Sequence, residues 1–295
     1  MNDIRKVGIL GGGLMGSGIA QVAAQAGFAT VVREVSDALA QRTRGTIEKS
    51  LARAVSRGKV TAEERDRALK QLYVTSRIAE LAECDVVIEA VVEDLEVKNS
   101  LWKELDALCP QHTIFASNTS SLTIAAMAAA TARADRMVGL HFFNPVPAMK
   151  LVEVVKTVTT SAETVERTFA FARALGKEPI AAKDNSGFVV NLLLIPYLLD
   201  AITQLERNVA SVEDIDLGMT LGTGHPMGPF TLLDFVGLDT VHKIAEIMYG
   251  EYRERRYAPP PLLKRMVLAG MYGRKSGRGF YDYTQDPPRP TSLGL

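Results

Sequence analysis

The feature that most limits how this chain can fold is a glycine-rich turn near its beginning. Residues 6–10 form an apolar run typical of a buried strand, and they lead directly into the turn GGGLMG at 11–16. In such a strand–turn–helix unit Gly11 permits the tight turn, Gly13 lets the backbone approach a pyrophosphate, and Gly16 lets the helix pack closely on the strand. The sequence therefore predicts a dinucleotide site at the start of a helix. The residues expected at the cofactor are Gly11, Gly13, Leu14, Met15 and Gly16.

The end of the second strand indicates which dinucleotide is bound. Residues 29–33 have the pattern of that strand, and Glu34 follows at the position where a carboxylate hydrogen-bonds the adenine ribose. A carboxylate there favours the free 2′-hydroxyl of NAD and repels the 2′-phosphate of NADP. We expect NAD, with Glu34 at the ribose. The neighbouring Arg33 leaves the preference open, because a guanidinium can accommodate that phosphate, although Arg33 also fits the solvent face of the strand.

The first part of the chain alternates short β-rich runs with helical ones, which is typical of a doubly wound, mostly parallel α/β sheet. Before a candidate strand at 72–75 lies a long helical stretch, about 36–71, which is broken at Gly58 and has a capping box at 61–64. We expect a projecting helical hairpin there. The sequence pattern fits both a functional arm and a surface insertion that only lengthens the fold. Further strands are expected at 85–90, 113–116, 137–142, 150–155 and 178–181, and helices at 14–26, 98–108, 122–130 and 162–175.

Helical periodicity dominates after Ser186, so we place a domain boundary there. Residues 1–185 are expected to form the Rossmann-type dinucleotide-binding domain and residues 186–295 an all-α domain. The apolar stretch 188–199 is too short for a membrane span, which needs about 20 apolar residues. Helices of the second domain are expected at 188–207, from 211, at 238–249 and at 261–269.

Charge and cysteine content argue against several kinds of partner. Lys plus Arg and Asp plus Glu both number 34, so there is no basic excess of the kind that nucleic-acid or membrane-surface binding requires. Cys84 and Cys109 are too few for a disulfide framework, and the histidines and cysteines show no metal-ligand spacing. We expect a cytoplasmic protein without a signal peptide and without metal, nucleic-acid or membrane partners.

Of the four histidines, His141 is the one placed for chemistry. The apolar run 137–142 brings it to the carboxyl end of a strand, where open α/β sheets bind ligands. Glu153 lies in a second apolar run, and a buried carboxylate is costly unless it is paired. If the two strands are antiparallel, the side chains can hydrogen-bond, and the carboxylate makes the imidazole a competent general base. The alternative for His141 alone is a satisfied core residue.

Several longer segments are specific enough to suggest a family. They are SNTSSL at 117–122, HFFNPVP at 141–147, MKLVE at 149–153, GFVVN at 187–191, HPMGP at 225–229 and GRKSGRGFY at 273–281. Together they resemble the 3-hydroxyacyl-CoA dehydrogenase family, most of all its short bacterial 3-hydroxybutyryl-CoA dehydrogenases, from Val7 to Tyr283. The resemblance implies an oxidoreductase that interconverts (S)-3-hydroxyacyl-CoA and 3-oxoacyl-CoA with NAD, and 3-hydroxybutyryl-CoA as the expected acyl-CoA thioester substrate.

The resemblance also implies roles for single residues. His141 would be the general base and Glu153 its orienting partner. The other matching positions are Ser120 and Asn191 at the substrate, Glu93, Lys98 and Asn118 at the cofactor, and Lys49 and Arg53 at the CoA phosphates. Without the resemblance, each residue has a simpler interpretation. Ser120 is then a helix N-cap, and Asn191 is a buried polar residue of a core helix. Lys49 and Arg53, which lie one helical turn apart, then belong to a solvated helix face.

The family further implies a homodimer through the C-terminal helical domain. Many relatives have Arg after the substrate-site asparagine, whereas this chain has Leu192, so we expect that face to make different contacts. Two other functions stay open. One is an NAD-dependent dehydrogenase of a free 3-hydroxy or sugar acid, which turnover of a thioester against its free acid would distinguish. The other is a catalytically silent NAD-binding structural protein, against which the presence of His141, Glu153, Ser120 and Asn191 argues.

Overall fold

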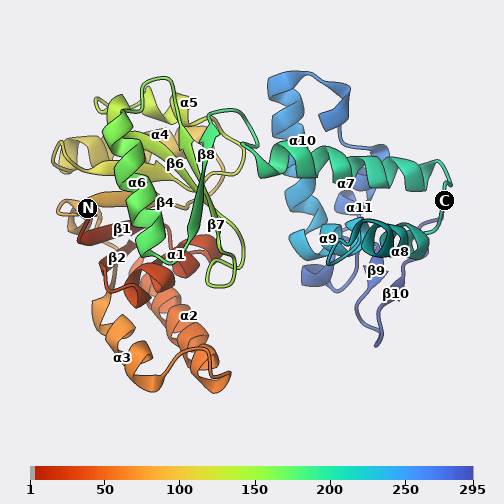
Figure 1. The fold of residues 1–295 in the computed structure, drawn as a ribbon, viewed down its shortest axis with the longest axis horizontal. Helices are drawn as coiled ribbons and strands as arrows, with labels where there is room; N and C mark the ends of the chain where they lie inside the picture. The colour runs from red at the N-terminus through yellow and green to blue at the C-terminus, as the bar shows by residue number, and fades with distance from the viewer. Residues whose placement is uncertain (1–3, 295) are drawn as a thin grey trace. The chain divides into compact units, whose positions relative to one another are not determined.

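The computed structural model describes residues 4–294, which form two compact units that divide between Phe188 and Val189 (Figure 1). The first unit is a sheet covered by helices, and the second is built mainly of helices. No helix among the described residues is both long and apolar enough to cross a bilayer.

Within residues 4–294, eight strands of the first unit form one sheet in the order β3-β2-β1-β4-β5-β6-β7-β8. Strand β7 is antiparallel to β6, and the other neighbouring pairs are parallel. This confirms the predicted doubly wound sheet, whose order reverses between β1 and β4, where such folds bind ligands. The strands are β1 Lys6–Leu10, β2 Ala29–Arg33, β3 Leu72–Thr75, β4 Val86–Glu89, β5 Ile114–Ser117, β6 Met137–Phe142, β7 Leu151–Lys156 and β8 Glu178–Lys183.

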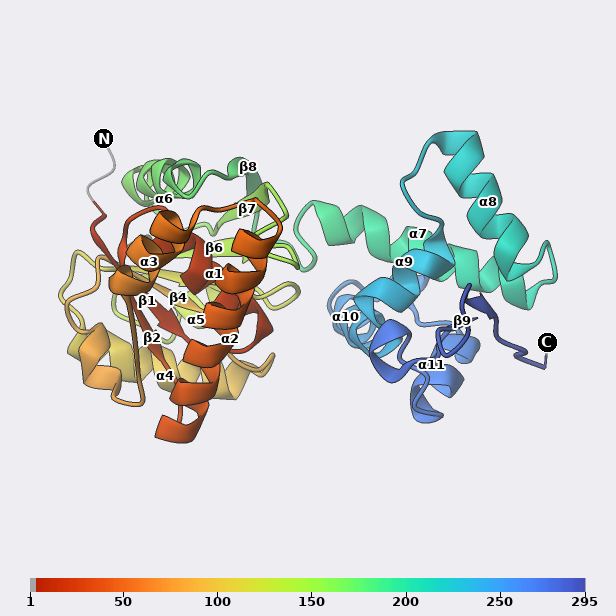
Figure 2. The ribbon, with the colours of Figure 1, turned by 90° about the horizontal axis from the view of Figure 1, so that it is seen from below.

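Helices cover both faces of this sheet, as Figures 1 and 2 show. Helices α1, α2 and α6 share one buried apolar core with the strands, and α4 and α5 share another. In the second core Trp102 and Phe115 are fully buried and stack with ring centroids 5.0 Å apart. The helices are α1 Leu14–Gln25, α2 Asp37–Ser56, α3 Ala62–Gln71, α4 Leu95–Leu108, α5 Ile124–Ala128 and α6 Ala162–Ala174, with 3₁₀ turns η1 Ile78–Leu81 and η2 Ala134–Arg136.

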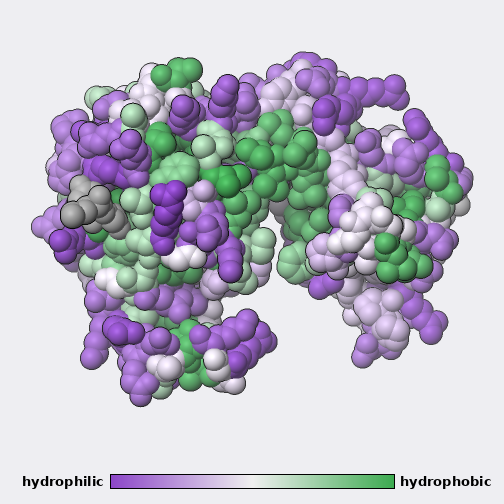
Figure 3. All heavy atoms as spheres, in the orientation of Figure 1, coloured by the Kyte–Doolittle hydropathy of each residue, from purple (hydrophilic) through white to green (hydrophobic). Residues whose placement is uncertain are grey.

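The predicted helical hairpin is confirmed and consists of α2 and α3. Thr61 accepts the backbone N–H of Glu64, whose side chain accepts the N–H of Thr61, so the expected capping box is present. Only one stripe of α2 is buried, including Ile47 and Leu51. The rest of the pair extends away from the sheet with a largely hydrophilic surface (Figures 1 and 3).

The helix expected at 122–130 is shorter than predicted, and Ser120 is not its N-cap. Helix α5 begins at Ile124, and its first N–H groups are capped by Asp184, sixty residues away in sequence. The carboxylate oxygens of Asp184 lie 2.7 Å from the backbone nitrogens of Ile124 and Ala125. A local capping signal therefore could not give the start of this helix.

In the second unit, α9 was missed by the sequence pattern. Its backbone N–H groups at Phe230 and Thr231 donate to the carboxylate of Asp216, on the preceding helix, rather than to a local cap. The elements of this unit are α7 Val190–Glu206, α8 Val212–Thr223, α9 Pro229–Val236, α10 Leu238–Tyr252, η3 Arg255–Tyr257, α11 Pro261–Leu268, η4 Arg274–Ser276, β9 Tyr281–Asp282 and β10 Arg289–Pro290.

Candidate active site

The glycine turn joins β1 to α1 and has the geometry that its sequence requires. Gly11 has φ of +93°, a conformation that favours glycine, and its N–H donates to Arg33 O at 2.9 Å. A Cβ at Gly16 would lie 1.8 Å from Gly11 O, so only glycine lets the helix approach so closely. A Cβ at Gly13 would meet no described atom within 4 Å, which leaves the backbone open in front of the helix.

A pocket of about 740 Å³ adjoins this turn at the switch point of the sheet. Both carboxylate oxygens of Glu34 accept backbone N–H groups, from Gly12 at 2.8 Å and from Val35 at 3.2 Å, so the carboxylate is held over the turn. Arg33 lines the same pocket and is partly buried. The lining residues are Gly11, Gly13, Arg33, Glu34, Val35, Ala90, Val91, Val92, Glu96, Val97, Ser100 and Leu101.

The residues around this pocket fit an adenine dinucleotide. Val35, Val92 and Val97 leave 70%, 66% and 42% of their surfaces exposed, which provides apolar walls for a flat base. The open backbone at Gly13 and the first turn of α1 provide N–H groups for a pyrophosphate. Of the two predicted residues between the glycines, Leu14 is 74% exposed beside the turn, whereas Met15 packs partly against the core.

His141 and Glu153 are brought together by the antiparallel pairing of β6 and β7, as their apolar runs predict. The two residues are direct register partners, and Nδ1 of His141 lies 2.6 Å from Oε2 of Glu153. Their exposures are 4% and 0%, so the pair is shielded from solvent screening. The rings of Phe143 and Phe188 lie 4.6 and 5.6 Å from the imidazole and provide apolar walls.

Ser120 lies on the opposite side of the same imidazole. Its Oγ is 3.0 Å from Nε2 of His141 and comes from the turn after β5. An ionised carboxylate only accepts hydrogen bonds, so in the neutral ring Glu153 fixes the proton on Nδ1 and leaves the Nε2 lone pair facing Ser120. The three side chains thus form a chain that presents a hydroxyl and a basic nitrogen together.

Both units of the chain match models of one enzyme family. The profile described as 3-hydroxyacyl-CoA dehydrogenase, NAD binding domain, matches residues 6–185, and the profile for the C-terminal domain of the same enzymes matches residues 187–283. The chain belongs to the 3-hydroxyacyl-CoA dehydrogenase family. The resemblance read from the sequence and the expectation of an NAD-dependent dehydrogenase are confirmed.

Individual relatives match over nearly their full length. A 3-hydroxybutyryl-CoA dehydrogenase of Mycobacterium tuberculosis is 52% identical over 286 residues, which cover 96% of this chain and 100% of that protein. Human mitochondrial hydroxyacyl-coenzyme A dehydrogenase is 48% identical over 288 residues, 95% of this chain and 91% of the relative. A crystal structure of (S)-3-hydroxybutyryl-CoA dehydrogenase from Ralstonia eutropha is 43% identical, covers 96% of this chain and 100% of its own, and has a TM-score of 0.92.

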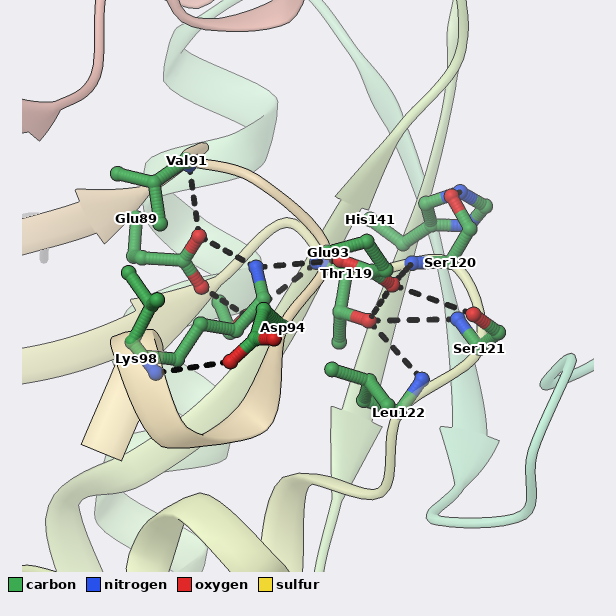
Figure 4. Close-up of polar contacts among 12 residues, drawn as sticks. Glu89, Val91, Glu93, Asp94, Lys98, Thr119, Ser120, Ser121, Leu122 and His141 are labelled. Atoms are coloured by element: carbon green, nitrogen blue, oxygen red, sulfur yellow. Dashed lines mark hydrogen bonds and ion pairs between the residues drawn. The ribbon is translucent and has the colours of Figure 1, made fainter. Parts of the chain in front are cut away.

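In this dehydrogenase fold Glu93 holds the turn that carries Ser120. Its Oε1 accepts the hydroxyl of Thr119, the backbone N–H of Ser120 at 3.3 Å and the hydroxyl of Ser121 at 3.2 Å (Figure 4). Burial alone would raise the pKa of Glu93, but Lys98 and these hydrogen bonds outweigh it and lower the pKa below its usual value. Glu93 is therefore ionised at neutral pH and fixes the turn as an acceptor.

Lys98 connects this turn to a second carboxylate that the sequence interpretation missed. Its Nζ lies 2.5 Å from Glu89 and 3.2 Å from Glu93, and Glu89 also accepts the Ser117 hydroxyl at 2.6 Å and the Val91 N–H at 2.8 Å. Figure 4 shows Lys98 between the two carboxylates. Glu89 and Lys98 are 0% and 1% exposed. The signal that singled out Glu153, a carboxylate in an apolar strand run, was present at Glu89 as well.

The remaining predicted residues lie at other places in the fold. Asn118 is buried, and its Oδ1 accepts the N–H of Phe142 at 2.9 Å, which ties the ends of β5 and β6 together. Lys49 and Arg53 are exposed side chains of α2. Asn191 is a buried residue in the first turn of α7, in the second unit.

Proposed function

We propose that the chain interconverts (S)-3-hydroxybutyryl-CoA and acetoacetyl-CoA, with His141 as the proton-transfer residue. The observation that carries the proposal is the buried chain from Glu153 through His141 to Ser120. The named activities of the relatives in Mycobacterium tuberculosis and Ralstonia eutropha support the substrate. Oxidation removes a hydride from C3 and a proton from its oxygen, and NAD, when bound, accepts the hydride.

The residues of the chain carry out the proton transfer of this reaction. Nε2 of His141 accepts the proton of the 3-hydroxyl as the C3–O bond becomes a carbonyl, and returns it in the reduction direction. Glu153 keeps Nδ1 protonated and stabilises the imidazolium that forms, in a site where little water screens the charge. The Ser120 hydroxyl, already beside Nε2, positions the same oxygen.

Further residues complete the proposal for the substrate and cofactor. Asn191 is assigned to the thioester side of the substrate and Asn118 to the cofactor side, where its bond to Phe142 fixes the loop after His141. Lys49 and Arg53 are assigned to the phosphates of CoA, because both are exposed cations one turn apart on α2.

A homodimer and a cytoplasmic location belong to the same proposal. Apolar side chains stand on the surface over α8, and Leu217 and Leu221 leave 56% and 75% of their surfaces exposed, as expected for an interface. Both cysteines are buried free thiols, which suits a reducing compartment.

Substrate comparison tests the proposed activity. Oxidation of NADH, followed by its absorbance, is expected to be rapid with acetoacetyl-CoA and at least a hundredfold slower with free acetoacetate at equal concentration, because binding of the CoA portion contributes to the rate. Equal or faster turnover of the free acid would instead support the dehydrogenase of a free hydroxy acid. Absence of turnover with both, alongside intact NADH binding, would support a silent NAD-binding protein.

A further inference from the structure

The dinucleotide pocket contains a cation that the proposed reaction does not use. Arg33 is the last residue of β2, where it pairs in register with Leu10 on one side and Thr75 on the other. Its side chain lines the pocket beside Glu34, at the position where the adenine ribose binds in this fold. The guanidinium and the ribose-binding carboxylate are thus adjacent in sequence and share one pocket.

The guanidinium of Arg33 forms no ion pair with the neighbouring Glu34. Glu34 directs both oxygens to backbone N–H groups, of Gly12 and Val35. The Nε–H of Arg33 is buried and has no hydrogen-bond partner among residues 4–294. A buried donor without a partner is costly, so the guanidinium would gain by turning toward a ligand that supplied an acceptor.

The kind of ligand follows from the chemistry of the two side chains. A guanidinium presents several N–H donors in a planar fork that matches a phosphate dianion. The only group that distinguishes NADP from NAD is a phosphate on the 2′-oxygen of the adenine ribose. Glu34 repels that phosphate, whereas Arg33 attracts it, so the two side chains act in opposite directions on the same group.

We infer that Arg33 is a recognition residue for the 2′-phosphate, and that the pocket takes NADP(H) as a second, weaker cofactor whose affinity Glu34 limits. The inference rests on the dinucleotide pocket and is independent of the proposed substrate and of His141. Its test uses binding alone, so its failure leaves the proposed function untouched.

Calorimetric titration of the intact protein with NADH and with NADPH gives the two Kd values that Arg33 is expected to affect differently. In Arg33→Gln the Kd for NADPH is expected to rise roughly tenfold, while the Kd for NADH stays within about twofold. Added salt should weaken NADPH binding more than NADH binding in the parent protein, and this difference should disappear in the variant. Arg67→Gln, an exposed change of the same charge on α3, is expected to alter neither Kd.

Removal of the Glu34 charge provides a second test, which works even if the parent protein binds NADPH too weakly to measure. Glu34→Gln should tighten NADPH binding roughly tenfold relative to NADH, and the double variant with Arg33→Gln should lose that gain. The inference is overturned if Arg33→Gln changes the two affinities by the same factor. It is also overturned if the double variant binds NADPH as tightly, relative to NADH, as Glu34→Gln alone.

Discussion

At the scale of single residues, the proposed proton transfer depends on how a buried carboxylate is paired. Glu153 has no exposed surface, and its charge is tolerated because Nδ1 of His141 donates to it at 2.6 Å. The same contact leaves Nε2 as the basic atom of the ring. One hydrogen bond therefore satisfies the buried carboxylate and, in the proposed reaction, leaves Nε2 as the atom that exchanges the proton.

Substitution of Glu153 by Gln tests this coupling. The amide retains the shape of the side chain but no longer stabilises an imidazolium, so kcat is expected to fall 10²–10⁴-fold, with an altered pH–rate profile. Steady-state rates of acetoacetyl-CoA reduction from pH 5 to 9 measure both, with the circular dichroism spectrum as the control for folding. A pH–rate profile identical to that of the parent protein would show that the pair is not coupled.

The sequence made the pair of His141 and Glu153 predictable, because each residue interrupts an apolar strand run and strand register alone brings them together. Ser120 and Glu93 needed the family resemblance, since their meeting depends on an irregular turn. Glu89 was not predicted. Its partner Lys98 belongs to a helix whose packing on the sheet the local pattern does not determine.

At the scale of elements, the site is assembled where β4, β5 and β6 end. Glu93 follows β4 and holds the turn after β5, and that turn carries Ser120 to the end of β6. Helix and strand positions were largely predictable from periodicity. The starts of α5 and α9 were not, because neither is capped by its own N-cap side chain: Asp184 caps α5 from 60 residues away, and Asp216 caps α9 from the preceding helix.

The lowered pKa of Glu93 predicts a pH-dependent contribution to stability. A carboxyl whose pKa is lower in the folded state stabilises the fold above its usual value of 4.5, and this contribution is lost as the pH falls through the folded-state pKa. Glu93→Gln should therefore lower the melting temperature by roughly 5 °C at pH 7, with a smaller difference from the parent protein at pH 4 and below.

Thermal unfolding of both proteins across this pH range provides the measurement. Glu104→Gln, an exposed change on helix α4, which begins just after Glu93, serves as the control and should move the melting temperature by less than about 1 °C at any pH. A constant difference between Glu93→Gln and the parent protein from pH 7 to pH 3 would contradict the role assigned to the charge.

At the scale of the whole molecule, the chain is divided into two units with separate cores. The first contains the dinucleotide pocket and the chain of Glu153, His141 and Ser120, and the second contains Asn191, which only the proposal assigns to the substrate. The change in periodicity near Ser186 lies close to the division seen in the structure, between Phe188 and Val189. Periodicity can mark such a boundary, because each unit buries its own apolar core.

The exposed leucines of α8 predict how the molecule associates. Light scattering after gel filtration is expected to give twice the chain mass of 32.0 kDa. Replacing Leu217 and Leu221 together by Asp should give the single-chain mass, because charges would be buried at the interface. Val158→Asp, a fully exposed position in the first unit, should remain dimeric. A parent protein that elutes as a monomer at micromolar concentration would contradict the dimer.

Substitution of His141 by Asn tests whether His141 transfers the proton. We expect kcat for acetoacetyl-CoA reduction to fall by at least about 10²-fold, because the amide cannot take or return a proton at the position of Nε2. The Kd for NADH, measured by titration of the same preparation, should stay within about twofold of the parent value, since His141 is not among the residues that line the dinucleotide pocket. Turnover within about tenfold of the parent protein would show that His141 does not transfer the proton.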